Sequence, residues 1–258
     1  MINDRPTGPS GHSRTAGRLS VQMYVAIKTR LLRGNAPPGA RLSVEELRAE
    51  FGVSKQPVME ALRLLTADGL VEILPQIGCV VTTYSPEEVE DFFHMFAAVQ
   101  GAVAAVAALH CTPAALDELD IVSQQIRALA ANPDQEIRND YLRLNRDFHE
   151  CIHSIAGSRM ITDTSRRMWD LSDFLINTAR MAQPMATSID GRQDDHDRIR
   201  NALASRDADA AKAEMEQHVL ETLDLLQGWD LTLSADPDRR GSVDRGNPCN
   251  GSLPPCRP

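Results

Sequence analysis

Apolar residues recur every three to four positions along most of the chain after Pro86, which is the spacing of amphipathic helices. Between residues 19 and 83 the pattern changes, because short helical stripes are followed by two short apolar runs, 70–74 and 79–83, that are typical of strands. The pattern therefore predicts a mainly α protein, in which a small module of helices and a β-hairpin precedes an all-α helical bundle.

Both ends of the chain lack this periodicity. Residues 1–18 and 234–258 are rich in Gly, Pro and Ser, and such segments cannot bury enough apolar surface to fold by themselves. We expect a disordered arm over 1–18, one domain over 19–83, an all-helical domain over 84–233 and a disordered tail over 234–258.

The segment over 42–65 predicts two helices joined by a tight turn. Ser43, followed three residues later by Glu46, has the capping-box pattern that begins a helix. Gly52 permits the left-handed residue that ends this helix, and Ser54 is expected to cap the next one.

Two short helices around such a turn are typical of a helix-turn-helix, and the hairpin that closes at residues 75–78 has the position of a wing. In a winged helix-turn-helix the start of the second helix enters the major groove of DNA. Here that start presents Ser54, Lys55, Gln56 and Met59. The alternative is a helical pair and a hairpin that have no nucleic-acid partner.

The chain has a formal net charge of -9, which by itself argues against a polyanionic partner. The charge is unevenly distributed, however. Residues 18–83 hold eight basic and six acidic side chains, whereas residues 84–258 hold 17 basic and 29 acidic ones. A mildly basic front on an acidic body suits a protein that offers only one end to DNA.

The run PPGARLSVEELRAEFGVSKQPVMEALRLLTADGLVEILPQIGCVV resembles the winged helix-turn-helix of the GntR family of bacterial regulators. The resemblance implies that the residues in contact with DNA include Ser43, Ser54, Lys55, Gln56, Met59, Gln76 and Gly78. The family usually has Arg at the positions of Lys55, Met59 and Ile77. Arg makes bidentate contacts to guanine that the other side chains do not make, so we expect DNA binding that relies more on phosphate contacts.

Three histidines fall on the inward faces of three predicted helices. In the helix predicted over 137–156, His149 lies four residues after Asn145, beside the apolar stripe. His196 lies on the apolar face of a later helix, and His218 lies within the apolar stripe of the last helix. Imidazoles that converge inside a bundle can hold zinc, nickel, copper or iron. The same spacing also fits histidines that only fill the core.

Residues 86–233 resemble the FCD domain, the helical ligand-binding domain of the FadR-type branch of the GntR family. Its pattern is an Asp or Asn, a Phe-His pair three residues on, and two further histidines 22 positions apart. This chain has that pattern in Asn145, Phe148-His149, His196 and His218. The resemblance implies a divalent metal, with zinc or nickel expected, bound by Asn145, His149, His196 and His218. It also implies that a small organic acid completes the coordination of the metal, and that His153 is a spare histidine that competes for it.

The first helix of an FCD domain usually carries an Arg and, four residues on, a Glu, where this chain has Phe96 and Gln100. We expect Phe96, Gln100 and Arg143 to line the effector pocket. Further candidates for the missing cation are Arg166, Arg167 and Arg180, although arginines in such positions usually lie on solvated faces.

These features indicate a cytoplasmic regulator that binds double-stranded operator DNA as a homodimer and responds to an organic acid. Because the family most often represses transcription, we expect it to be a repressor. We expect no enzyme activity and no membrane association. The polar N-terminus lacks the apolar core of a signal peptide, and we expect no apolar run to reach the roughly 20 residues of a membrane span. The segment 92–109 is apolar on more than one face, as in a bundle core or a dimer interface.

Two alternatives remain open at this point. In the first, the protein is a DNA-binding regulator whose metal is purely structural, or one that has no effector. In the second, more remote alternative, the protein is a metal-dependent hydrolase in which a three-histidine site activates water. No HExxH-type motif supports the hydrolase. The five cysteines show no CxxC spacing and are expected to be reduced, mostly buried thiols.

Overall fold

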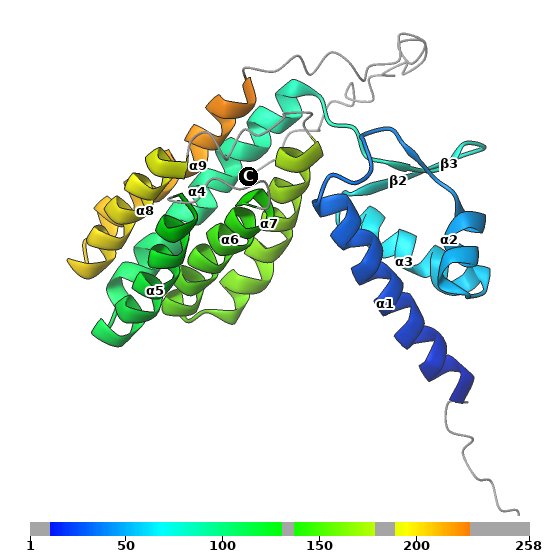
Figure 1. Cartoon of the computed structure of the whole chain (residues 1–258), viewed down its shortest axis with the longest axis horizontal. Helices are drawn as coiled ribbons and strands as arrows, with labels where there is room; N and C mark the ends of the chain where they lie inside the picture. Colours follow the sequence, from blue (N-terminus) through cyan, green and yellow to red (C-terminus); the bar gives the residue numbers. More distant parts are fainter. Residues whose placement is uncertain (1–10, 131–136, 179–188, 228–258) are drawn as a thin grey trace, which may run out of the picture.

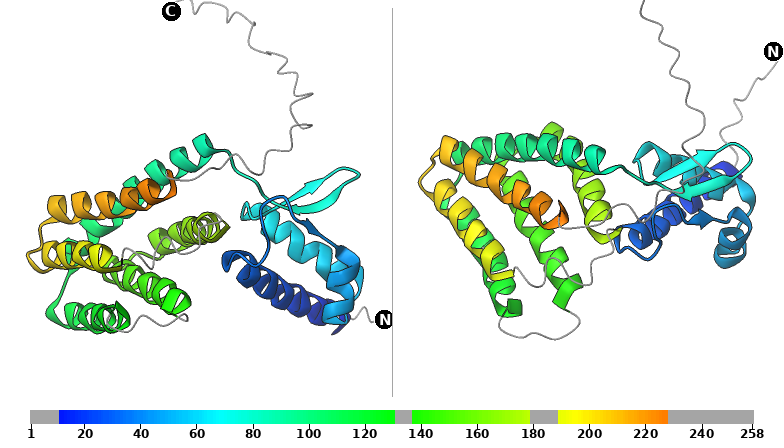
Figure 2. Two further views of the ribbon diagram at one scale, coloured as in Figure 1. Left: turned by 45° about the horizontal axis from the view of Figure 1, so that its top comes forward. Right: turned by 90° about the horizontal axis from the view of Figure 1, so that it is seen from above.

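The computed structural model describes residues 11–130, 137–178 and 189–227. The predicted tail from residue 234, with Cys249 and Cys256, and the first ten residues of the predicted arm lie outside this part of the chain. Figures 1 and 2 show two units, a small N-terminal domain of helices beside a sheet and a larger bundle of helices. The protein is therefore mainly α, as the apolar pattern predicts.

The N-terminal domain is a winged helix-turn-helix (Figure 1). Its elements are α1 (Gly11–Leu32), β1 (Arg41–Leu42), α2 (Val44–Phe51), α3 (Lys55–Ala67), β2 (Val71–Leu74) and β3 (Gly78–Val81). Ser43 caps α2 by accepting a hydrogen bond of 3.2 Å from the Glu46 N–H, and Gly52 ends it with a φ of 63°. Helix α3 packs against α1 through buried apolar side chains, namely Val58, Ala61, Leu62 and Leu65.

The sheet has the strand order β1–β3–β2, and both pairs are antiparallel. Strands β2 and β3 form the predicted hairpin, in which Val71 faces Val81 and Leu74 faces Gly78. Its strands differ from the predicted runs by one or two residues at their ends. Strand β1 has no counterpart in the sequence pattern, because two residues are too short to show alternation.

Helix α1 begins at Gly11, within the segment 1–18 that the composition predicts to be a disordered arm. The prediction of a disordered arm over 1–18 is therefore wrong for residues 11–18. Adding a residue to an existing helix costs much less than nucleating a new helix, which allows α1 to continue through a segment that has no apolar stripe.

The second domain is a helical bundle. Its helices are α4 (Pro86–His110), α5 (Pro113–Ala130), α6 (Ile137–Ala156), α7 (Arg159–Thr178), α8 (Ile189–Ala204) and α9 (Ala208–Gln227). A complete capping box starts α4, because Ser85 and Glu88 each accept a hydrogen bond from the backbone N–H of the other. Helix α4 contacts α6, α7, α8 and α9 and so forms the centre of the bundle (Figure 2).

Helix α4 is long and apolar enough, by length and composition alone, to cross a membrane. The expectation that no apolar run reaches this length is therefore wrong. However, 56% of the apolar window is buried inside the protein, and Phe93 and Phe96 are almost fully buried there. The apolar composition of α4 follows from its place in the bundle core.

Cysteine side chains in the described residues are free thiols. Cys79 and Cys111 are buried and Cys151 is half-buried, which agrees with the prediction of mostly buried thiols. Burial raises the pKa of each of these three thiols, so they remain protonated and unreactive at neutral pH.

The two domains meet where α1 contacts α7. The side-chain amide of Asn177 donates a hydrogen bond of 2.7 Å to the carbonyl oxygen of Leu32. Lys28 Nζ on α1 lies 2.6 Å from Asp170 Oδ2 on α7. Gly34 has a φ of 69°, and a Cβ at this position would overlap the backbone of Asn177. Glycine is therefore required here both by conformation and by space.

Candidate nucleic-acid interface and metal centre

The start of α3 presents an exposed polar edge. Ser54, Lys55 and Gln56 are exposed. Ser54 occupies the N-cap position of α3, as predicted, but its side chain makes no capping hydrogen bond. Its hydroxyl is therefore not used by the helix. Met59 is only half-exposed because it packs against the core, so it offers less surface to DNA than the sequence suggests.

The wing turns through two residues with positive φ, Gln76 at 66° and Gly78 at 103°. Arg41 of β1 lies beside this turn, because a Cβ at Gly78 would be 3.9 Å from Arg41 Nε. An exposed arginine therefore stands next to the wing, although Ile77 occupies the position where the family usually has one. The sequence does not reveal Arg41 because the pairing of β1 with β3 has no local signal.

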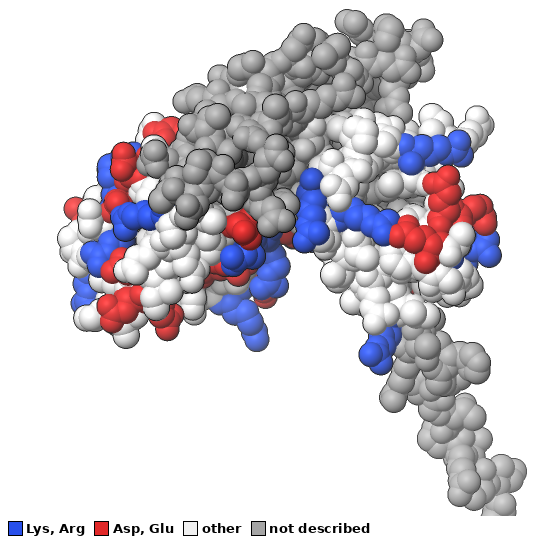
Figure 3. All heavy atoms as spheres, viewed as in Figure 1, with Lys and Arg blue, Asp and Glu red and all other residues white. Residues whose placement is uncertain are grey.

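Charges of both signs are interspersed on the face of the molecule in Figure 3. Much of the N-terminal domain on this face is uncharged, and no large patch of one sign is visible. This face therefore shows no broad basic surface for phosphate contacts. Lys55 and Arg41 are exposed cations of the N-terminal domain.

Three buried histidines converge in the helical bundle. His149 on α6, His196 on α8 and His218 on α9 each offer one ring nitrogen, and these atoms lie within 4.8 Å of one another. The Nε2 atoms of His149 and His218 are 3.3 Å apart, and none of the three side chains is more than 1% exposed. The structure thus brings together the three histidines that the helix stripes and the family pattern select.

The three histidines are neutral in the folded protein. Burial lowers the pKa of each ring well below its usual value, and neighbouring positive groups lower the pKa further. For His218 the largest of these neighbours is Arg192. Neutral imidazole is the form that binds a metal, so no proton has to be removed before coordination.

A carboxylate orients one of the three rings. Asp195 Oδ2 lies 3.1 Å from His218 Nδ1, and Asp195 is itself buried and bonded to Arg198 at 2.5 Å. A proton on Nδ1 facing the carboxylate leaves a lone pair on Nε2, and this atom lies 3.3 Å from His149 Nε2 and 3.2 Å from Arg192 Nη2. A carboxylate behind a ligating histidine is the common arrangement at protein metal sites.

Several nitrogen atoms at this centre have no hydrogen-bond partner among the described residues, namely both ring nitrogens of His196 and Nδ1 of His149. A buried polar atom without a partner costs about 1–3 kcal/mol. Stacking of the His196 ring on Phe148, with centroids 4.0 Å apart, fixes the ring plane without satisfying these atoms. Lone pairs on neutral, buried and pre-oriented imidazoles fit a divalent metal of the zinc or nickel type.

Asn145 lies in the same region. It is 7% exposed and lines a small inner cavity of about 20 Å³ together with His218, Arg192, Phe96 and other side chains. Its Oδ1 accepts a weak hydrogen bond of 3.5 Å from the Tyr141 hydroxyl, which leaves a second lone pair on this oxygen. A cavity of this size holds about one water molecule.

The structure places the residues expected at the effector pocket in different surroundings. Phe96 lines the inner cavity and packs edge-on against Trp169. Gln100 is buried in a hydrogen-bonded cluster, in which its amide oxygen lies 2.9 Å from His153 Nε2 and its amide nitrogen donates to Ser165 at 2.6 Å. This cluster also engages His153, the spare histidine, which is absent from the convergent group. Arg143 does not line the cavity.

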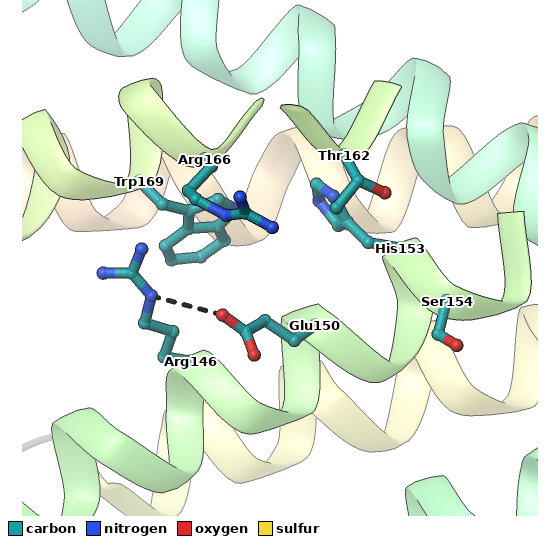
Figure 4. A pocket seen from close by; sticks show the side chains of 7 residues that line it. All are labelled: Arg146, Glu150, His153, Ser154, Thr162, Arg166 and Trp169. Atoms are coloured by element: carbon teal, nitrogen blue, oxygen red, sulfur yellow. Dashed lines mark ion pairs between the residues drawn. The ribbon is translucent and has the colours of Figure 1, made fainter. Parts of the chain in front are cut away.

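A second, larger cavity of about 300 Å³ opens between α6 and α7 (Figure 4). Its lining includes Arg146, Glu150, His153, Arg166 and Trp169, and Arg146 pairs with Glu150 on the α6 wall at 3.6 Å. Trp169 lines both cavities, and its ring lies 4.4 Å from that of His149. The indole therefore separates the open cavity from the histidine centre.

The proposed substitutes for the family arginine do not reach the inner cavity. Arg143 is exposed and pairs with Asp147 at 2.9 Å, Arg166 lines only the outer cavity, and Arg167 bonds to the N-terminal domain at Ala67. Arg180 lies outside the described residues. The arginine that does line the inner cavity is Arg192. It lies four residues before His196 and therefore on the same face of α8, a spacing that the sequence contains.

Comparison with known proteins decides the family. Residues 19–81 match the model for bacterial regulatory proteins of the gntR family, and residues 91–221 match the FCD domain. The chain belongs to the GntR family and carries an FCD domain. This GntR regulator is therefore a DNA-binding transcriptional regulator and not an enzyme.

Relatives support this assignment. The transcriptional repressor RspR of Escherichia coli K12 is 28% identical over 200 residues, which cover 78% of this chain and 85% of the relative. The repressor GlaR of the same strain is 23% identical over 212 residues, covering 81% and 96%. The solved structure of E. coli McbR/YncC has a TM-score of 0.69 at 18% identity, with 81% of this chain and 97% of that chain covered. At this identity the structure supports the fold alone.

Proposed function

We propose that this GntR regulator binds a divalent metal through His149, His196 and His218, and that a small organic acid bound at the metal changes its affinity for operator DNA. The observation that carries the proposal is the convergence of three buried, neutral histidines whose ring nitrogens lie within 4.8 Å of one another. Zinc or nickel suits these ligands. When bound, such a metal supplies a localised positive charge that can hold an oxygen of the acid.

Asn145 is the proposed fourth ligand. Its amide oxygen is neutral, whereas the Asp that the FCD pattern also allows at this position would bring a negative charge. Because three imidazoles and an amide leave the charge of the metal uncompensated, this centre favours an anionic ligand in its open coordination position. The organic acid supplies that anion.

For DNA binding, we propose a cytoplasmic homodimer that presents the start of α3 and the wing to two half-sites of an operator and represses transcription. Helix-turn-helix proteins commonly read two half-sites with two-fold symmetry. The names of RspR and GlaR identify both relatives as repressors. The proposed contacts remain Ser43, Ser54, Lys55, Gln56, Met59, Gln76 and Gly78, with Arg41 added from the geometry of the wing.

A chain of ion pairs runs from α6, next to Asn145, to the C-terminal end of α3, the helix whose start is proposed to read DNA. Arg146, which follows Asn145 on α6, bonds to Asp170 of α7 at 2.7 Å. Asp170 contacts Lys28 of α1 at 2.6 Å, and Lys28 contacts Asp68 at 2.9 Å. Asp68 is the C-cap residue of α3. A ligand that shifts α6 would therefore act on a connected set of charges that reaches the end of the DNA-reading helix, and we propose this set as the coupling element.

The proposal predicts that metal and acid together change operator affinity. A labelled DNA fragment from immediately upstream of the regulator's own gene is titrated with metal-free protein, and again with zinc and acetate present, and binding is followed by fluorescence anisotropy. We expect the midpoint to shift by about fivefold or more, since allosteric coupling typically lies between 5- and 150-fold. The His149→Ala variant should bind the DNA with one affinity under both conditions.

The same titration discriminates the alternative functions. Operator binding that is tight and unaffected by zinc or acetate, in a protein that does retain zinc, would identify the metal as purely structural. An equal affinity for an unrelated DNA fragment under all conditions would contradict a specific operator.

A further inference from the structure

Arg192 is a buried arginine without a carboxylate partner. Arg192 is 4% exposed. Nε and Nη1 have no hydrogen-bond partner, while Nη2 lies 3.2 Å from His218 Nε2. Other arginines of the bundle, such as Arg146 and Arg200, form ion pairs with aspartates. No Asp or Glu of the described residues forms an ion pair with Arg192.

The groups around Arg192 do not neutralise its charge. Asp173 lines the same cavity, but its carboxylate bonds to Arg146 at 2.6 Å. Asp195 is engaged by His218 and Arg198. Burial raises the pKa of Tyr141, and the adjacent Arg192 guanidinium opposes this rise, so the Tyr141 hydroxyl is a neutral neighbour. A buried cation that lacks a partner is strongly destabilising.

The position of Arg192 suggests what completes it. Its guanidinium borders the inner cavity that Asn145 and His218 also line, and it lies at the nitrogen of His218 that faces the histidine centre. An anion that entered this cavity would border the guanidinium of Arg192, whose Nε and Nη1 have no hydrogen-bond partner among the described residues. A planar guanidinium matches the two oxygens of a carboxylate. The inner cavity of about 20 Å³ has room for about one water molecule, so a carboxylate group enters it only when the lining side chains move apart.

We propose that Arg192 is the effector-recognition cation of this regulator, and that it would bind the carboxylate group of an effector held at the metal site. This inference rests on the proposed metal site. The cation then comes from α8, four residues before His196, and not from the α4 position that Phe96 occupies. The proposal assigns the effector to the carboxylates, with the carboxylate end in the inner cavity.

This arrangement makes metal and carboxylate bind cooperatively. Without the anion, the charge of Arg192 opposes a divalent cation beside His218, and neutral Asn145 does not compensate for it. With the anion present, both positive groups gain a partner. By thermodynamic linkage, the carboxylate then raises the affinity for the metal by the same factor as the metal raises the affinity for the carboxylate.

The test is a zinc titration of the full-length protein against a competing fluorescent chelator, with and without acetate, at constant ionic strength set with sodium chloride. We expect acetate to raise the zinc affinity of the parent about tenfold, within the usual range of coupling between sites. The Arg192→Gln variant should bind zinc at least as tightly as the parent without acetate and gain less than about twofold from acetate. Arg143→Gln, which removes an exposed arginine of α6, should behave as the parent.

A second measurement covers the effect of the substitution on folding. The metal-free Arg192→Met protein should unfold at a higher temperature than the metal-free parent, because an uncompensated buried charge is removed. An equal gain from acetate in the parent and in Arg192→Gln would overturn the role of Arg192, while leaving the metal site intact. A larger gain from inorganic phosphate than from acetate would overturn the carboxylate assignment. A parent that binds no zinc under any condition would instead refute the proposed function.

Discussion

Replacing Lys28 with methionine is expected to lower the free energy of unfolding by about 3 kcal/mol, because the carboxylates of Asp68 and Asp170 lose the cation that lies between them. The Lys28 ammonium group lies between Asp68, at the end of α3, and Asp170, on α7, and its side chain is only 15% exposed. Although burial opposes it, hydrogen bonding to Asp170, Tyr24 and Asp68 raises the pKa of Lys28. The lysine therefore remains charged and holds two carboxylates from two domains. Urea denaturation measures the loss.

Arg30→Met is the matched control. Arg30 is also on α1 and also pairs with a carboxylate, that of Glu50, but both side chains are more than 40% exposed. Exposed pairs contribute little to stability, so this variant should unfold close to the parent. In Lys28→Met, Asp170 keeps its ion pair with Arg146, so adding Asp68→Asn alone should recover part of the loss, because the charge of Asp68 is then removed as well. Equal losses for Lys28→Met and Arg30→Met would contradict a special role for Lys28 between the domains.

Reversing the charge at the start of the recognition helix is expected to weaken operator binding by about 100-fold near 0.1 M salt in the Lys55→Glu variant. Lys55 is exposed at the first position of α3, next to the unused hydroxyl of Ser54. In a dimer the substitution removes one phosphate contact from each half-site. The slope of log affinity against log salt concentration should therefore fall by about two. Anisotropy titrations at several salt concentrations measure both quantities.

Lys212→Glu separates this local effect from the change in overall charge. Lys212 lies on α9 of the helical domain, where its side chain is 52% exposed and lies 3.8 Å from Glu216. The net charge changes by the same amount as in Lys55→Glu, but at a surface away from the proposed DNA contacts. Operator affinity should stay close to that of the parent. Equal losses in the two variants would assign the effect to net charge and would remove Lys55 from the interface.

Most of the fold follows from apolar periodicity and from local capping signals. The bounds of α6 agree with the stripe predicted over 137–156, because a long amphipathic helix has a strong signal. Gly52 and the hairpin between β2 and β3 have equally local causes. Strand β1 depends on pairing with a strand almost 40 residues away in the sequence, and the early start of α1 depends on helix continuation. Neither has a local signal.

The candidate site likewise combines features that the sequence predicts with features that only the structure shows. Helical spacing directs His149, His196 and His218 inward, so their convergence follows from one-dimensional reasoning once the helices are packed. The engagement of His153 by Gln100 depends on the packing of α4 against α6, which the sequence does not specify. Arg192 lies on the same helix face as His196, and the spacing of four residues would have identified it. Its lack of a counter-charge is visible only in the structure.

The central claim, that the helical domain of this regulator holds a metal on three histidines, is tested most directly by the metal content of the purified protein. The protein is stripped with a chelator, reloaded with zinc, dialysed and measured by elemental analysis beside two variants, His149→Ala and His153→Ala. Both variants remove a buried histidine from α6, one inside the convergent group and one bonded to Gln100. We predict about one zinc ion per chain in the parent and in His153→Ala, and none in His149→Ala, because the loss of a ligand to the metal cannot be compensated. Zinc retained by His149→Ala, or absent from the parent, would contradict the account.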